Sequence, residues 1–189
     1  YRTAFATATW RTGLSQELTG EVRAEAERDR RAFGVELAGL VGAWGVARAA
    51  LAGSHDTLLG AEEHGHMVQL GIERSSRGGG GALHYERASA GFAPFGEPVT
   101  EAALARRARS RLIASIGAPL WQRLSGGASY VRQASWDGES VELASVSLSV
   151  PVGRRASMNV AFNKRLDDDR AWRAAMSLSL PLADGLYAS

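Results

Sequence analysis

The 189-residue sequence contains no cysteine, a single lysine and no long run of apolar residues. Without cysteine, the chain has no disulfides, no thiolate metal ligands and no cysteine nucleophile. Arginine supplies nearly all of the positive charge, and a net charge of +2 is too small to indicate nucleic-acid binding. No window holds the roughly 20 consecutive apolar residues that a membrane-spanning helix needs.

The opening residues, YRTAFATATW, also lack the basic start, apolar centre and small-residue cleavage site of a signal peptide. Instead, small or apolar residues alternate with polar ones, as they would if the sequence began in the middle of a strand. We therefore expect the chain to be a fragment of a longer protein.

Aliphatic and polar residues alternate in the stretch ASVSLSVPVGRRASMNVAFNK, residues 144–164. Val146, Leu148 and Val150 alternate with serines, and after PVGRR the alternation resumes at Met158. A period of two predicts strands, and the intervening turn predicts a hairpin. The apolar side of such strands contacts either a protein core or, in a membrane barrel, lipid.

The same period of two recurs along the chain and predicts about eleven strands. We expect them near residues 2–10, 17–28, 31–41, 44–54, 65–75, 80–90, 107–117, 123–134, 140–150, 154–165 and 170–182. Most are longer than the roughly 5–6 residues of a globular strand and close to the roughly 9–11 residues that cross a bilayer. A mean hydropathy of −0.15 suits a barrel wall, in which only alternate residues face lipid. We predict an all-β antiparallel meander that forms part of a large transmembrane β-barrel.

Residues 18–53 are the part whose composition favours a helix, because they are rich in Ala, Glu, Arg and Leu. Leu18, Val22 and Ala26 also fit a helical spacing of four. However, small or apolar residues occupy every even position from Leu18 to Ala26, and polar residues occupy the odd positions between them. We interpret this segment as strands, with its charged residues forming a ladder on one face.

Two long connections fit the alternation of short turns and long loops in outer-membrane barrels, whereas the connections at 28–30, 135–139 and 166–169 are short on the side where long loops are expected. Short tips fall at 41–44, 76–79, 118–122 and 151–153, and long connections fall at 55–64 and 89–106. Tryptophans occur near the ends of the predicted strands, where they suit the aromatic girdles of a membrane protein. These residues are Trp10, Trp44, Trp121, Trp136 and Trp172.

No motif in the sequence indicates an enzyme, a metal site or a cofactor site. EEHGH, residues 62–66, has metal-capable side chains but no third ligand set, so we interpret it as a solvated loop. DDDR, residues 167–170, lacks the spacing of a calcium loop and is interpreted as a charged hairpin tip. RGGGG, residues 77–81, lacks the lysine of a phosphate loop and is interpreted as a turn. For His84, inside a predicted strand, we expect a structural or lumen-facing role.

Four stretches of the sequence follow one another in an order typical of a known family. Residues 11–56, RTGLSQELTG through GSHD, have the family's succession of strands and turns, and YVRQASWDG keeps Trp136 but departs at Ser135 and Asp137. MSLSLPL is similar to the end of a further strand of the same family. The stretch LHYERASAGFAPFGE keeps the family's frame at Tyr85, Ser89, Gly91, Phe92 and Phe95, with Arg87 where a second aromatic is common. Together these motifs resemble the fimbrial outer-membrane ushers, the pores of chaperone–usher pilus assembly.

The resemblance implies that residues 1–189 are part of a translocation-pore β-barrel domain, from just after the plug insertion to about mid-barrel. The N-terminal periplasmic, plug and C-terminal domains of ushers are not visible in the sequence. The resemblance also implies an outer-membrane location, contact with the lipid bilayer, and pilus subunits and their periplasmic chaperone as partners of the full-length protein. It implies no catalytic, cofactor-binding or metal residues, because usher assembly proceeds by strand exchange between subunits rather than covalent chemistry.

If the strands form such a wall, alternation assigns each side chain to lipid or to the lumen. We predict that Val22, Leu37, Leu51, Val68, Leu70, Ile72, Leu112, Ile116, Val146, Leu148, Val160, Phe162, Met176, Leu178 and Leu180 face lipid. We predict that Glu21, Arg23, Glu25, Glu36, Arg48, Gln69, Glu73, Arg111, Ser147, Asn159, Asn163 and Ser179 face the lumen.

Two other classes of protein fit the same pattern. A complete small outer-membrane porin or channel predicts that the first and last strands pair with each other. A soluble all-β binding or adhesion protein predicts that a second sheet covers the apolar face. A partial barrel in lipid has unpaired strand edges, which predicts closure or association with further chains.

Overall fold

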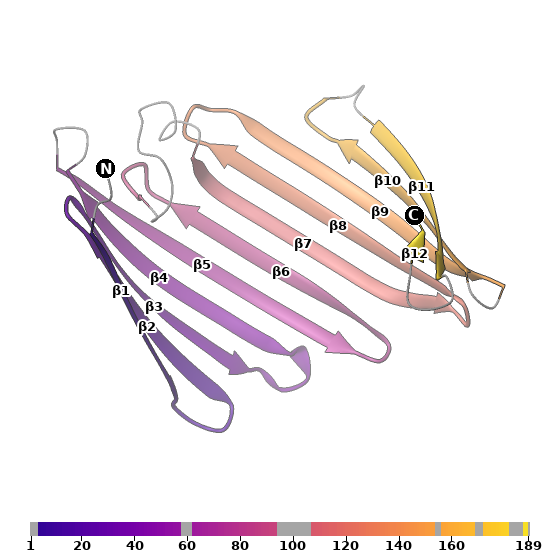
Figure 1. The fold of residues 1–189 in the computed structure, drawn as a ribbon, viewed down its shortest axis with the longest axis horizontal. Coiled ribbons are helices and arrows are strands. Elements are labelled where there is room, and N and C mark those ends of the chain that lie inside the picture. Colours follow the sequence, from indigo (N-terminus) through magenta and orange to yellow (C-terminus); the bar gives the residue numbers. More distant parts are fainter. Residues whose placement is uncertain are drawn as a thin grey trace. The chain divides into compact units, whose positions relative to one another are not determined.

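The computed structural model describes residues 4–57, 62–93, 107–153, 156–168, 172–181 and 187–188. These residues form twelve strands and one short 3-10 helix, η1 (Gly42–Trp44). The strands are β1 (Phe5–Gly13), β2 (Leu18–Glu27), β3 (Arg30–Leu40), β4 (Val46–Asp56), β5 (Glu63–Ser76), β6 (Gly79–Ala88), β7 (Ala108–Trp121), β8 (Leu124–Ser135), β9 (Ser140–Val152), β10 (Ala156–Arg165), β11 (Trp172–Pro181) and β12 (Tyr187–Ala188). They are hydrogen-bonded in sequence order in one sheet (Figure 1). The predicted all-β antiparallel meander is therefore confirmed.

The chain divides into two compact units. Unit 1 consists of Tyr1–Glu73, His84–Leu112 and Gln133–Ser140, and unit 2 consists of Arg74–Leu83, Ile113–Arg132 and Val141–Ser189. The division cuts across the strands, so that β5, β6, β7 and β8 contribute residues to both units, and β9 lies in unit 2 except for its first residue, Ser140.

The eleven predicted strands are all present, and the structure corrects several of their ends. Residues 18–53, whose composition favours a helix, form strands apart from a turn at 28–29 and a connection at 41–45 that contains the short η1. β7 continues to Trp121, so the predicted tip at 118–122 is only a turn at 122–123. β5 begins at Glu63, which shortens the predicted 55–64 connection to residues 57–62. The two-residue β12 was not predicted.

The tryptophan prediction is wrong at one position and fits the strand ends at the others. Trp10 lies inside β1, three residues before that strand ends at Gly13. Trp121 is the last residue of β7, Trp172 is the first of β11, Trp136 follows β8, and Trp44 lies in η1 between two strands.

Cross-strand pairing in unit 1 sorts the side chains onto two faces. Glu21 lies opposite both Arg11 and Glu36, and Glu36 lies opposite Ala50, which in turn lies opposite Gln69. Directly opposite residues share a face and alternate residues return to it, so this row fixes a polar face. The other face is apolar; its central row is Val22, Val35, Leu51 and Val68. We call these the polar face and the apolar face of unit 1.

Pairing in unit 2 gives the same division for β9, β10 and β11. Leu148 lies opposite Val160, and Val160 lies opposite Met176, which defines the apolar face of unit 2. On the other face Ser149 lies opposite Asn159, and Asn159 lies opposite Ser177. A one-residue slip in register would exchange the two faces, so the strict alternation in the sequence specifies this register.

The described residues bury little apolar surface. Phe92 and Ala93 are the buried apolar residues among them, whereas the large side chains of both apolar faces are exposed or half-buried. Leu51 is 57% exposed in unit 1, and Met176 is 74% exposed in unit 2. In the described part of the chain, no helix is long and apolar enough to cross a membrane. Large apolar side chains exposed along one face of a sheet are typical of a surface that contacts lipid or protein.

Candidate functional site

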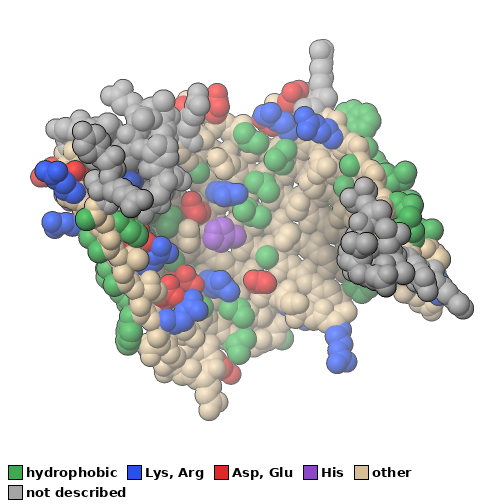
Figure 2. Space-filling view, in the orientation of Figure 1, with side chains coloured by type: hydrophobic (Ala, Val, Ile, Leu, Met, Phe, Trp, Pro, Cys, Tyr) green, Lys and Arg blue, Asp and Glu red, His purple; other side chains and the backbone are tan. Residues whose placement is uncertain are grey.

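The polar face of unit 1 carries most of the charged residues that the sequence assigned to a lumen. Cross-strand pairing places Glu21, Arg23, Glu25, Glu36, Arg48, Gln69 and Glu73 together on this face. Figure 2 shows acidic and basic side chains intermingled on the face of unit 1 that is turned toward the viewer. The pairing groups these residues as predicted, and their exposure to a lumen stays a prediction.

Opposite charges on this face neutralise one another locally. Arg11 forms an ion pair with Glu21 across β1 and β2 at 2.7 Å, and Arg23 pairs with Glu25 along β2. Exposed pairs of this kind contribute about 0–1 kcal/mol each. Their consequence is therefore a surface of mixed charge rather than a large gain in stability.

Two further polar contacts extend the face. The Gln69 amide donates a hydrogen bond of 2.8 Å to Glu86, which brings β6 residues of the same parity, including His84, onto the polar face. Arg11, Thr19, Glu36 and Arg48 help to line a hollow of about 150 Å³.

In unit 2 the corresponding face is uncharged over most of its length. Ser147, Asn159, Asn163 and Ser179 share it, as pairing within β9, β10 and β11 requires. Ser145 donates a hydrogen bond of 2.6 Å to Asn163 between adjacent strands. The remaining predicted lumen residue, Arg111, precedes Leu112 in β7, so the two side chains lie on opposite faces of that strand.

A chain segment packs against the polar face of unit 1, and no pattern in the sequence predicts this contact. Residues 89–93 follow β6 in the chain and lie against the start of β5. The backbone N–H of Ala93 donates a hydrogen bond of 2.9 Å to Ser54 Oγ, and Arg107 donates one of 2.8 Å to the Phe92 carbonyl. His66 and Ser89 exchange two hydrogen bonds, one of them through Ser89 Oγ. The segment is therefore held at both ends.

Glycines make this close approach possible. A Cβ on Gly65 would overlap the backbone of Gly91 and Phe92, and a Cβ on Gly91 would lie 2.6 Å from the His64 carbonyl oxygen. Only a residue without a side chain lets the two backbones meet here. Beside this contact, Met67 and Phe92 help to line a hollow of about 270 Å³, together with Ala32, Gly34 and Ala52.

The motifs that we interpreted as inert require two corrections. Glu63 to His66 belong to β5, so EEHGH is mostly strand rather than a solvated loop. Gly79 to Gly81 begin β6, which leaves only residues 77–78 of RGGGG as a turn. No cluster of three or more metal-capable side chains occurs within the described ranges. In the predicted tip at 167–170, Arg165 donates a hydrogen bond to Asp167, which lowers the pKa of that carboxyl.

Parts of some predictions lie outside the described residues. These are the beginning of the first predicted strand, residues 58–61 and 94–106 of the two long connections, and residues 154–155, 169–171 and 182–186. Phe95, which carries part of the usher resemblance, is among them.

Comparison with known proteins supports the fold. No protein-family model matches the sequence, and no curated protein matches it. The structure is similar to the translocation pore of the P pilus usher (PapC), with a TM-score of 0.66 and 18% sequence identity. The match covers 95% of this chain and 39% of that pore, so the chain spans well under half of its structural relative. The chain therefore has an usher-like β-barrel fold.

Proposed function

We propose that this chain is a wall segment of an outer-membrane usher pore that assembles pilus subunits delivered by a periplasmic chaperone and secretes them. The observation that carries the proposal is the pair of opposite faces on strands of bilayer-crossing length. One face exposes aliphatic and aromatic side chains and the other carries polar ones. The likeness to the P pilus usher pore supports the same fold.

The apolar faces match the hydrocarbon core of a bilayer. β2, β3 and β4 contain 10, 11 and 11 residues, and a tilted strand needs roughly 9–11 to cross. Backbone groups within the sheet are paired strand to strand, which lipid requires because it offers no hydrogen-bonding partners. Residues 1–189 then form part of one translocation-pore domain in the outer membrane.

The polar faces suit the passage of a folded protein. Short-range ion pairs such as Arg11 with Glu21 leave no large field of one sign. Serine and asparagine cover the corresponding face of unit 2. A passing subunit thus meets a hydrated surface without large apolar patches, and the proposed activity needs no catalytic residue or cofactor.

Photo-crosslinking from neighbouring positions of one strand tests this function. A photoreactive amino acid at Glu36 or at Leu37 places the probe on the polar or the apolar face of β3 in the full-length protein. During pilus assembly in its own cells, we expect crosslinks to a pilus subunit from position 36 and to lipid from position 37. Subunit crosslinks from position 37 alone, or from neither position, would rule out passage along the polar face.

A further inference from the structure

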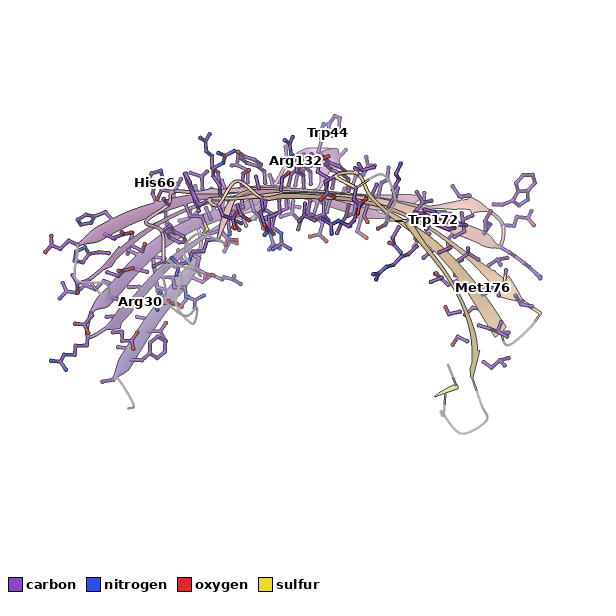
Figure 3. The ribbon with its side chains drawn as sticks, turned by 90° about the horizontal axis from the view of Figure 1, so that it is seen from above. Arg30, Trp44, His66, Arg132, Trp172 and Met176 are labelled. Carbon is purple, nitrogen blue, oxygen red and sulfur yellow. The ribbon has the colours of Figure 1, made fainter. Side chains whose placement is uncertain are left out.

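A row of basic and hydrogen-bonding side chains crosses three strands on the apolar face of unit 1. Arg31 of β3 lies directly opposite His55 of β4, and His55 lies directly opposite His64 of β5. By parity these residues share the face of Val35, Leu51 and Val68. His66 follows on the same side, and Figure 3 shows it on the opposite side of the sheet from Arg30.

The two histidines of the row contact each other. Their rings are stacked with centroids 4.6 Å apart, and the two Nδ1 atoms are separated by 3.3 Å. When one Nδ1–H donates to the other Nδ1, the accepting ring carries its proton on Nε2. The pair therefore keeps one N–H donor, on Nε2 of the accepting ring, and Arg31 lies directly opposite His55 in the same row.

The adjacent row on the polar face has the opposite character. There Arg30 lies opposite Asp56, and Asp56 lies opposite Glu63. The carboxylates of Asp56 and Glu63 thus point away from the apolar face. Ala26 lies opposite Arg31 on its other side, and within the described ranges no acidic side chain forms an ion pair with Arg31. Arg31 and His64 are exposed and His55 is half-buried.

The row also lies at a boundary. The next row along the apolar face is Phe33, Gly53 and His66, and the row after it is Val35, Leu51 and Val68. The side chains on this face thus change from polar donors to aliphatic groups within two rows, near the end of β4 and the start of β5. In a membrane protein this is the depth at which lipid headgroups meet the hydrocarbon core.

We propose that Arg31, His55 and His64 bind the phosphate of an anionic lipid headgroup. The proposal rests on the proposed function, because it requires the apolar face of unit 1 to contact lipid. A guanidinium binds phosphate oxygens through two parallel hydrogen bonds, and the Nε2–H of the histidine pair supplies a third. The aliphatic rows below the site accommodate the acyl chains of the same lipid.

The test measures lipid binding by the full-length protein in neutral detergent containing EDTA, using native mass spectrometry. Three probes are compared: dioleoylphosphatidic acid, dioleoylglycerol and inorganic phosphate. We expect phosphatidic acid to bind about tenfold more tightly than dioleoylglycerol, which corresponds to one charge-assisted contact. The variant Arg31→Gln, His55→Gln, His64→Gln should lose this preference, whereas Arg48→Gln on the polar face should keep it.

Three results would overturn the headgroup site. They are an unchanged preference in the triple variant, equal binding of inorganic phosphate and phosphatidic acid, and binding that appears only when zinc replaces EDTA. If the triple variant does not fold, as judged by circular dichroism, the single variant His64→Gln replaces it. Failure of the lipid contact on which the proposed function depends is distinguishable, because the wild-type protein would then fail to insert into neutral phosphatidylcholine vesicles. Failure of the headgroup site alone would leave that insertion intact.

Discussion

Leu148→Arg is expected to destabilise the lipid-inserted protein by about 2–4 kcal/mol, the cost of arginine on the lipid face near mid-membrane. Leu148 lies within β9 on the apolar face of unit 2, directly opposite Val160. It is 38% exposed, and the residue directly opposite it on that face, Val160, is aliphatic. A guanidinium at this depth must either enter hydrocarbon or draw water and headgroups toward it.

Ser147→Arg is the matched control, because it changes the adjacent residue of the same strand. Ser147 lies on the polar face of unit 2, opposite Ala161, where a charged side chain stays hydrated. We expect its effect to fall within about 0.5 kcal/mol, as for most surface substitutions. Reversible folding of the full-length protein into vesicles, followed in urea, measures both. Equal losses from the two substitutions would contradict the assignment of faces.

The second large effect is expected at Gly65, where any side chain displaces the segment 89–93. A Cβ at this position overlaps the backbone of Gly91 and Phe92. The segment must therefore move, and the hydrogen bond from Ala93 to Ser54 is lost or distorted. For Gly65→Ala we expect a loss of about 1–3 kcal/mol, the range found for overpacking. Limited proteolysis should also cleave between residues 89 and 93 faster than in the wild type.

Gly53→Ala is the control for this substitution. Gly53 lies directly opposite His66 on the apolar face, and a Cβ there meets no atom closer than 3.8 Å. We expect its stability and its cleavage pattern to stay close to those of the wild type. Comparable cleavage in Gly53→Ala and Gly65→Ala would show that contact with Gly65 does not hold the segment.

The strands were predictable because one face of each strand is apolar and the other is polar, which produces a period of two in the sequence. Between Leu18 and Ala26, a strict period of two outweighed helix-forming composition, and the structure confirms strands there. Helix propensity differs by only a few tenths of a kcal/mol per residue among most residue types, so burial and pairing readily override it. The alternation also grouped Glu21, Arg23 and Glu36 on one face before any register was known.

Strand ends were less predictable, because the pattern that marks a strand fades where its faces meet water. β7 extends to Trp121 although Gly117 and Pro119 interrupt its apolar pattern. β5 includes His64, which the sequence placed in a connection. Backbone pairing with neighbouring strands holds these residues in the sheet. The sequence of a single strand does not show how far this pairing extends.

The packing of residues 89–93 could not be predicted, because it depends on contacts between distant parts of the chain. Ser54, Gly65 and Arg107 hold the segment, and none of them has a local sequence signal for this role. The basic row is similar, since Arg31, His55 and His64 come together only through cross-strand register. Side-chain character follows from the sequence, whereas these juxtapositions require the sheet.

Spin labelling along residues 145–150 and 157–162 tests most directly whether lipid covers the apolar faces. The chain contains no cysteine, so single cysteines can be introduced for labelling without removing native ones from it. In the membrane-inserted full-length protein, labels at even positions should collide with oxygen dissolved in lipid, and labels at odd positions with a water-soluble nickel complex. This alternation must persist across the whole hairpin. Water accessibility at Leu148 and Val160 equal to that at Ser147 and Asn159 would show that lipid does not cover this face.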